Sequence, residues 1–166
     1  AILLLLSVVC FSTAKADFSF DCPTADDLNR YIDTKLRAEV TGPLAGKIQL
    51  YYRLLRAFDA SKPTVLLING GPGGDSSIIE GFQLTKLKDE VNFVSFDHRG
   101  LGCTRVMTKV IPFGNEMGLF GMSRAADDIE AIRKDLLGPT GQWFVYGVSY
   151  GTMLGQQYVT RFPGAV

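Results

Sequence analysis

Residues 143–151 read WFVYGVSYG and carry the strongest fold signal in this chain of 166 residues. The first six are an apolar run with the aromatic and β-branched side chains that favour a strand. Residues 150–162 have the pattern of a helix, and Pro163 ends it because the residue before a proline avoids helical geometry. We therefore predict that a strand passes directly into a helix at Ser149.

The glycines on either side of Ser149 indicate how such a sharp turn can form. The turn strains the serine backbone and crowds together the residues two before and two after it. Gly147 and Gly151 lack the Cβ atoms that would clash there. Ser149 would then be exposed at the C-terminal end of the sheet, at a helix N-terminus whose dipole favours negative charge. The alternative for these five residues is a glycine-rich turn that performs no chemistry.

The same alternation of apolar runs and helical segments extends through the chain from about residue 47 onward. It predicts a parallel α/β sheet with right-handed crossovers. The expected strands are 47–56, 64–68, 91–96 and 143–148. The expected helices are 76–87, a helix that Ser123 caps and Gly138-Pro139 end, and 150–162, with weak helical character over 26–36.

A glycine-rich loop, NGGPGG at 69–74, follows one of the predicted strands. A serine that attacks a carbonyl needs two N–H donors for the oxyanion, one from the next residue, here Tyr150, and one from a loop after a neighbouring strand. Pro72 has no N–H, so Gly71 is the candidate for the second donor and Gly70 the alternative. A phosphate-binding loop is disfavoured because neither the Gly-Lys-Ser/Thr ending nor G-x-G-x-x-G spacing is present.

Three ordered motifs give the chain a family resemblance. NGGPGG, then DHRGLGCT at 97–104, then GVSYG at 147–151 resemble the motifs of the prolyl aminopeptidase and tripeptidyl aminopeptidase group of α/β-hydrolases. The resemblance implies a partial α/β-hydrolase fold, with a mostly parallel sheet flanked by helices, truncated after the nucleophile-elbow helix. It also implies that Ser149 is the nucleophile and that the N–H groups of Gly71 and Tyr150 form the oxyanion hole.

The resemblance further implies an enzyme that releases N-terminal proline or short peptides through an acyl-enzyme, with a peptide as substrate and no cofactor. Two alternatives stay open. One is an esterase or another α/β-hydrolase with the same frame, and the other is a non-catalytic pseudo-hydrolase or binding module. No acidic residue and no histidine follow Ser149. Loss of triad members costs on the order of 10⁴ to 10⁶ in turnover, so we expect a fragment that is inactive by itself.

The first and second motifs each depart from the family pattern. Asn69 stands where many members have His, and Thr104 replaces a Ser. We interpret Asp97 and Arg99 as a charge pair that stabilises the loop, with a chemical role as the alternative. His98 is interpreted as a loop residue rather than a base, because the base of this fold follows the nucleophile in the chain.

Residues 1–16 are predicted to be a signal peptide whose start is missing, leaving residues 17–166 as the N-terminal part of the hydrolase domain. Ile2–Phe11 is apolar, is too short to span a bilayer, and is followed by Ala14-Lys15-Ala16, a typical cleavage site. We therefore expect export to a periplasm or the cell exterior, and no membrane contact in the mature form. A lipid anchor through Cys10 and a buried N-terminal element are the alternatives.

Cys22 and Cys103 would remain after cleavage, either as a disulfide or as two half-buried thiols. No Cys/His cluster has metal-ligand spacing. Lys and Arg total 17, as do Asp and Glu, so charge gives no reason to expect a nucleic acid or an anionic membrane as partner. The oligomeric state is not indicated.

Overall fold

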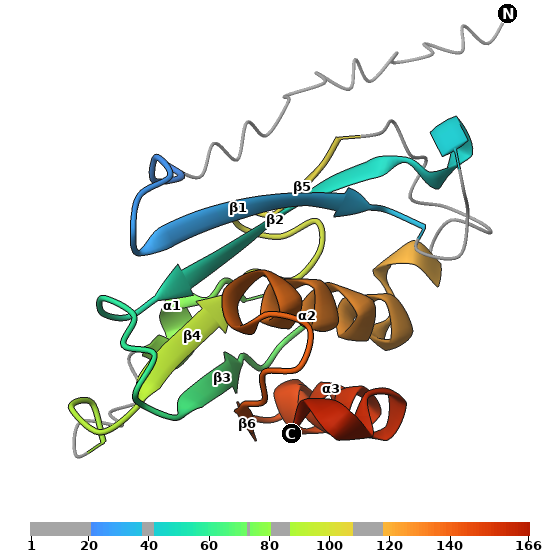
Figure 1. The fold of residues 1–166 in the computed structure, drawn as a ribbon. Coiled ribbons are helices and arrows are strands. Elements are labelled where there is room, and N and C mark those ends of the chain that lie inside the picture. Colours follow the sequence, from blue (N-terminus) through green and yellow to red (C-terminus); the bar gives the residue numbers. More distant parts are fainter. Residues whose placement is uncertain (1–20, 38–41, 73, 81–86, 108–117) are drawn as a thin grey trace, which may run out of the picture.

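The computed structural model describes residues 21–37, 42–72, 74–80, 87–107 and 118–166. In this part of the chain, a sheet carries helices on both faces (Figure 1). Helices α2 (Met122–Leu137) and α3 (Tyr150–Arg161) pack on one face, and the short helix α1 (Ser77–Glu80) packs on the other. The predicted signal peptide at 1–16 lies outside the described residues.

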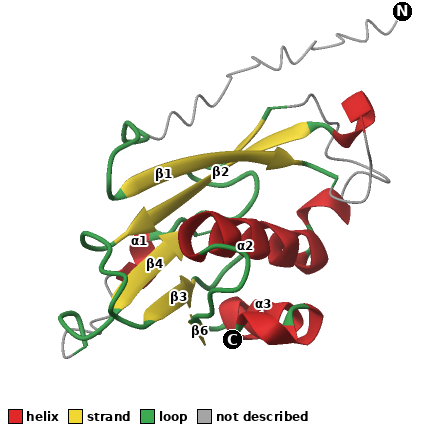
Figure 2. Ribbon diagram, viewed as in Figure 1, coloured by secondary structure: helices red, strands yellow, loops and turns green. Residues whose placement is uncertain are grey.

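The sheet joins antiparallel strands at one side to parallel strands at the other (Figure 2). The strands lie in the order β1-β2-β4-β3-β6, and β5 pairs with β2. Strand β3 is parallel to β4 and to β6, whereas the pairings of β2 with β1, β4 and β5 are antiparallel. The bounds are β1 (Asn29–Lys35), β2 (Lys47–Leu54), β3 (Thr64–Ile68), β4 (Asn92–Phe96), β5 (Arg105–Val106) and β6 (Phe144–Gly147). Short 3₁₀ turns include Gly42–Ala45 and Pro163–Ala165.

The parallel register brings three loops to one edge of the sheet. Ile68 at the end of β3 pairs with Gly147 at the end of β6, and Leu67 pairs with Ser95 near the end of β4. The ladder continues past the strands, because the Val148 N–H donates to the Ile68 carbonyl at 3.1 Å. The residues that follow β3, β4 and β6 are therefore neighbours, although they lie far apart in the sequence.

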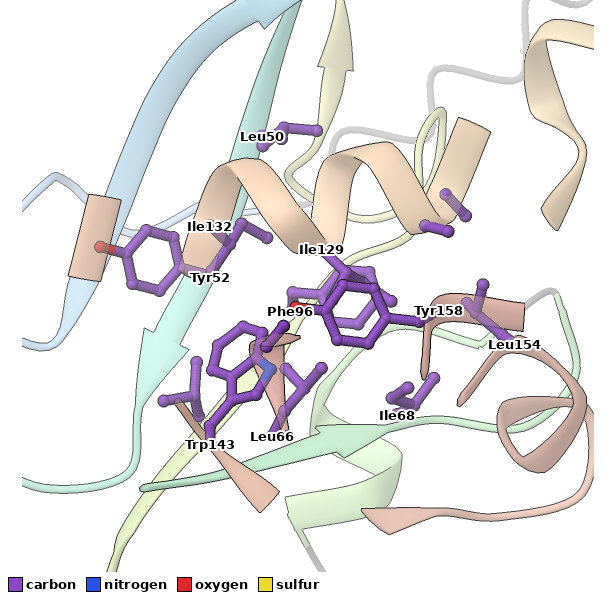
Figure 3. Packing of buried hydrophobic residues seen from close by; sticks show 14 of the residues in the cluster. Leu50, Tyr52, Leu66, Ile68, Phe96, Ile129, Ile132, Trp143, Leu154 and Tyr158 are labelled. Carbon is purple, nitrogen blue, oxygen red and sulfur yellow. The ribbon is translucent and has the colours of Figure 1, made fainter. Parts of the chain in front are cut away.

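The main core lies between the sheet and helices α2 and α3 (Figure 3). Alternate residues of β3 point to opposite faces, so Leu66 and Ile68 join this core while Leu67 packs with Ile79 of α1. Complete burial of a large apolar side chain contributes about 1.5–3 kcal/mol. The largest fully buried side chains of this core include Tyr52, Phe96, Ile129 and Tyr158.

The predicted strands at 47–56, 64–68, 91–96 and 143–148 are confirmed, with small shifts of their ends. The weak helical character predicted over 26–36 is wrong. Asn29–Lys35 forms β1, paired with β2 from Asn29↔Arg53 to Lys35↔Lys47. Strand pairing therefore outweighs the local helical pattern, and the β-branched and aromatic side chains of this segment suit a strand.

Two helix ends also differ from the prediction. Helix α2 begins at Met122 with Gly121 as its N-cap, so the expected cap at Ser123 is wrong. Ser123 lies inside the first turn, and its side chain accepts a hydrogen bond from Arg161. Helix α1 is described only over Ser77–Glu80, and residues 81–86 of the predicted helix lie outside the described residues. Over the part of the chain that is described, no helix has the length and apolar content needed to cross a membrane.

Candidate active site

The turn between β6 and α3 holds Ser149 in an unusual backbone conformation. Its φ of 53° and ψ of −121° make it the single non-glycine residue with positive φ among those the structure describes. Such a conformation costs on the order of 1–3 kcal/mol and persists only where surrounding contacts impose it. The side chain of Ser149 is exposed, at the junction of a strand with a helix N-terminus.

Two glycines make this turn sterically feasible. A Cβ on Gly147 would lie 2.3 Å from the carbonyl oxygen of Gly151, and a Cβ on Gly151 would lie 2.3 Å from that of Ile68. In both cases the obstacle is backbone, which cannot swing aside as a side chain can. The crowding expected from the GVSYG pattern is therefore present in the structure.

The glycine-rich loop after β3 lies directly against Ser149. A Cβ on Gly70 would be 3.2 Å from the Ser149 Cβ and 3.8 Å from its Oγ, so the absence of a side chain there allows close approach. The Gly70 N–H donates to Oδ1 of Asn69 at 2.8 Å, and Asn69 Nδ2 donates to the Asp75 carbonyl at 2.7 Å. Asn69 thus holds both ends of the loop.

These bonds separate the two candidate oxyanion donors in this loop. The Gly70 N–H is already engaged by the Asn69 side chain, which makes it a poor donor to a substrate. Gly71 is exposed and has a φ of 114°, a conformation that favours glycine. Tyr150, the other candidate, is the first residue of α3, where N–H groups have no acceptor within the helix.

The loop after β4 is built differently, by buried polar contacts. Asp97 accepts hydrogen bonds from the backbone N–H groups of Ser76 and Cys103, both at 2.7 Å. Thr104 donates its hydroxyl to the Asp97 carbonyl at 2.8 Å and accepts from the Tyr51 N–H at 2.9 Å. Asp97 therefore ties this loop to the segment that follows the glycine-rich loop.

The predicted charge pair between Asp97 and Arg99 is wrong. Arg99 instead pairs with Asp128 of α2 through two hydrogen bonds of 2.7 Å. Both side chains are buried, with exposed fractions of 2% for Arg99 and 3% for Asp128. Arg99 also donates to the carbonyls of Leu36 and Leu119. Burial raises the pKa of the Asp128 carboxyl, and the hydrogen bonds from Arg99 oppose that rise. The pair anchors the loop to the helix behind it.

His98 lies in the predicted loop but is buried, with 4% of its surface exposed. Its ring packs edge-on against Tyr150, with 5.8 Å between ring centroids, and against Phe96, with 4.9 Å between centroids. Burial lowers the pKa of His98, so the ring is neutral near pH 7. The sequence could not indicate the contact with Tyr150, because Tyr150 lies far from His98 in the chain.

The structure joins Cys22 and Cys103 by a disulfide, with 5.5 Å between their Cα atoms. The bond fixes the segment before β1 to the loop after β4, close to Asp97. No cluster of three or more His, Cys, Asp or Glu side chains that could hold a metal occurs among the residues placed in the structure. The chain therefore brings together the predicted serine, the glycine-rich loop and the elbow glycines at one edge of the sheet.

Comparisons with known proteins agree with this architecture. The model of the alpha/beta hydrolase fold family matches residues 63–166. The proline iminopeptidase PfmaB of Pestalotiopsis fici is 30% identical over 118 residues, which are 71% of this chain and 38% of PfmaB. A proline iminopeptidase of Chitinophaga pinensis is 25% identical over 101 residues, covering 61% of this chain and 31% of that protein. The chain thus spans well under half the length of these relatives.

Solved structures show the same fold. The epoxide hydrolase VrEH1 of Vigna radiata has a TM-score of 0.57 and 17% identity, over 83% of this chain and 37% of that one. A 2-hydroxy-6-oxo-6-phenylhexa-2,4-dienoate hydrolase of Rhodococcus has a TM-score of 0.56 and 17% identity, over 82% of this chain and 44% of that one. At such identity the likeness concerns the fold alone. From the family match and the two iminopeptidase relatives, we conclude that this chain belongs to the alpha/beta hydrolase fold family, in which it is prolyl aminopeptidase-like.

Proposed function

We propose that this chain is the nucleophile-bearing part of a serine aminopeptidase that releases N-terminal proline or short peptides. The observation that carries the proposal is the geometry at Ser149. The side chain is exposed on a strained turn, and the loop that contains Gly71 passes within contact distance of it at Gly70. The similarity to proline iminopeptidases supports a peptide as the substrate.

In this mechanism Ser149 Oγ attacks the carbonyl carbon of the first peptide bond and loses its proton to a histidine base. The residues after Ser149 contain neither His, Asp nor Glu, so we propose that the base and its acidic partner come from further sequence of the protein. The negative charge on the former carbonyl oxygen is received by the N–H groups of Gly71 and Tyr150. The C–N bond then breaks, and the leaving amine takes the proton from the base.

The second half of the reaction releases the product. Water, deprotonated by the same base, attacks the ester between Ser149 and the N-terminal residue, and the oxyanion forms again at the same donors. Collapse of this intermediate returns the proton to Ser149 Oγ and frees the acid. The dipole of α3 favours negative charge at this point in both steps.

Export is part of the proposal. Residues 1–16 carry the pattern of a signal peptide, and the disulfide between Cys22 and Cys103 is of the kind that persists in oxidising compartments. The expected substrates are therefore peptides of a periplasm or of the cell exterior.

A fluorophosphonate probe tests the nucleophile directly in the complete protein that contains this sequence. We expect the wild type and Ser61→Ala to be labelled and Ser149→Ala to remain unlabelled. Ser61 is a suitable control because it is exposed and precedes β3, at the other end of the sheet. Labelling that persists in Ser149→Ala would remove Ser149 as the nucleophile.

A substrate series tests the class of reaction. We expect cleavage of proline and tripeptide amides that carry a free N-terminus, and a loss of cleavage when that amine is acetylated. Turnover of short esters without turnover of any amide would favour an esterase. An absence of both labelling and turnover in the complete protein would favour a binding module that kept the scaffold.

A further inference from the structure

The glycine-rich loop has no polar side chains of its own with which to keep its shape. Residues 70–74 are Gly, Gly, Pro, Gly and Gly. Glycine restricts its backbone less than any other residue, so such a loop keeps one conformation only where neighbouring groups impose it. An oxyanion donor must be in place before the charge develops. The position of the Gly71 N–H therefore depends on groups outside these five residues.

Asn69, the residue before these five, supplies a side chain that spans the loop. Its Oδ1 accepts from the Gly70 N–H at 2.8 Å, and its Nδ2 donates to the Asp75 carbonyl, beyond the loop, at 2.7 Å. The carboxylate of Asp75 is directed onward, to the Ser77 N–H at 2.9 Å. Asn69 is buried, with 4% of its surface exposed, so little water competes for its two hydrogen bonds. Its amide thus joins the start of the loop to its end.

The backbone of Asn69 lies against the elbow that carries the other candidate donor. A Cβ on Gly151 would be 2.8 Å from the Asn69 carbonyl oxygen, so the first turn of α3 is in contact with this backbone. Just before that turn, the Val148 N–H donates to the Ile68 carbonyl at 3.1 Å. Tyr150 lies between these two contacts in the chain. The position of its N–H is therefore set relative to Asn69.

We propose that Asn69 is a positioning residue whose side-chain amide holds the Gly71 N–H at the distance from the Tyr150 N–H that an oxyanion requires. This inference rests on the proposed function of Ser149. Asn69 does not touch the substrate in this role, because its amide oxygen and nitrogen are both bound to backbone. It also keeps the Gly70 N–H occupied, which leaves the next N–H of the loop to face the substrate.

Asn92 provides a matched control at the opposite end of the sheet. It begins β4, is buried with 7% of its surface exposed, and spans the loop before β3 with the same kinds of contact. Its Oδ1 accepts from the Asp59 N–H at 2.9 Å, and its Nδ2 donates to the carbonyls of Asp59 and Lys62 at 2.8 and 3.1 Å. Leucine has nearly the size of asparagine but cannot form these bonds. A merely structural role therefore predicts the same consequences for both leucine variants.

Steady-state kinetics of the complete protein tests the proposal. We expect Asn69→Leu to lower kcat by about 10- to 100-fold, as a donor displaced by a fraction of an ångström would, with KM changed less than about 3-fold. Asn92→Leu should leave kcat and KM unchanged. Both variants should lose thermal stability, because each leaves buried backbone groups without partners. With assays run below both unfolding temperatures, lost stability cannot account for a difference in kcat.

A transition-state analogue reports on the oxyanion donors themselves. The probe is an aldehyde of proline or of a tripeptide, whichever matches the preferred substrate, because its adduct with Ser149 carries an oxyanion. Its affinity should fall in Asn69→Leu by the same factor as kcat. Affinity for the corresponding alcohol, which forms no adduct, should stay unchanged. Asn92→Leu should bind both compounds as the wild type does.

The outcomes distinguish this inference from the proposed function. Failure of the wild type to label with fluorophosphonate at Ser149 overturns the proposed function itself. Normal labelling of the wild type with an unchanged kcat or aldehyde affinity in Asn69→Leu overturns the positioning role, as does an equal loss of kcat in Asn92→Leu. If Asn69→Leu does not fold, Asn69→Ala and Asn92→Ala are compared instead. Alanine removes the same bonds without placing methyl groups against the loop backbone, and the same outcomes decide.

Discussion

The turn after β6 and the loop after β4 lie at the same edge of the sheet and keep their shapes by opposite means. The turn is shaped by missing atoms, because Gly147 and Gly151 leave room for backbone that any Cβ would obstruct. The loop is shaped by side chains, because Asp97 accepts hydrogen bonds from two backbone N–H groups and Arg99 donates hydrogen bonds to Asp128.

This difference matches what each region has to present. The turn leaves Ser149 exposed in a strained conformation, which suits a side chain that must meet a substrate. The polar side chains of the loop are buried, and they bind to α2, to β2 and to the segment after the glycine-rich loop. We infer that the loop after β4 is a scaffold on which the other two loops rest.

The largest effect is expected from Arg99→Ala in the loop. The substitution leaves the carboxylate of Asp128 buried without its partner, and such a loss typically costs about 3–5 kcal/mol of the free energy of unfolding. Urea denaturation of the complete protein measures it. The matched control is Arg161→Ala. It breaks a more exposed ion pair with Asp127, which lies on α2 beside Asp128, and should cost about 0–1 kcal/mol. Equal losses in the two variants would show that burial does not distinguish the pairs.

The next largest effect is expected from Gly147→Ala in the turn. Its Cβ would meet the Gly151 backbone at 2.3 Å, and overpacking of this kind costs about 1–3 kcal/mol. Fluorophosphonate labelling of Ser149 should fall as well, because the turn must open to admit the methyl group. Gly164→Ala, where a Cβ has nothing within 4 Å, should change the free energy of unfolding by less than about 0.5 kcal/mol. A Gly147→Ala variant with full stability and labelling would contradict the crowded geometry.

The turn was predictable from sequence, whereas the loop was predictable only in part. GVSYG encodes a local steric requirement, so five adjacent residues carry the information for the strand, the turn and the helix start. The role of Arg99 depends on Asp128, which lies 29 residues away and becomes its neighbour only once α2 packs on the sheet. The sequence suggested the nearer partner, Asp97, and that choice was wrong.

The same reasoning explains the other differences between prediction and structure. Strand β1 is specified by its antiparallel pairing with β2, a contact between distant segments that residues 26–36 do not encode by themselves. The packing of His98 against Tyr150 likewise depends on two loops that meet at the sheet edge. The strands of the parallel region were easier to predict, because continuous apolar runs such as 64–68 mark strands covered on both faces.

A smaller effect is expected from Asp97→Asn in the loop. The amide keeps the size of the carboxylate but offers one acceptor oxygen, so one of the Ser76 and Cys103 N–H groups loses its partner. The expected cost is about 1–2 kcal/mol of the free energy of unfolding. Thermal denaturation measures the loss, and hydrogen exchange at the Ser76 and Cys103 amides should identify the released group. Unchanged exchange at both amides would mean that Asp97 does not hold the two loops together.

The smallest effect is expected from Ser149→Gly, and it has the opposite sign. Glycine adopts a φ of 53° without the strain that a Cβ imposes, while it loses more backbone entropy on folding. The balance is a gain of about 1 kcal/mol or less in the free energy of unfolding. Ser149→Ala keeps the Cβ, so it should show no such gain, although both variants lose the hydroxyl and the fluorophosphonate label. If the two variants were equally stabilised, the hydroxyl rather than the backbone would be the source of the strain, and the turn would not differ from the loop in the way the geometry indicates.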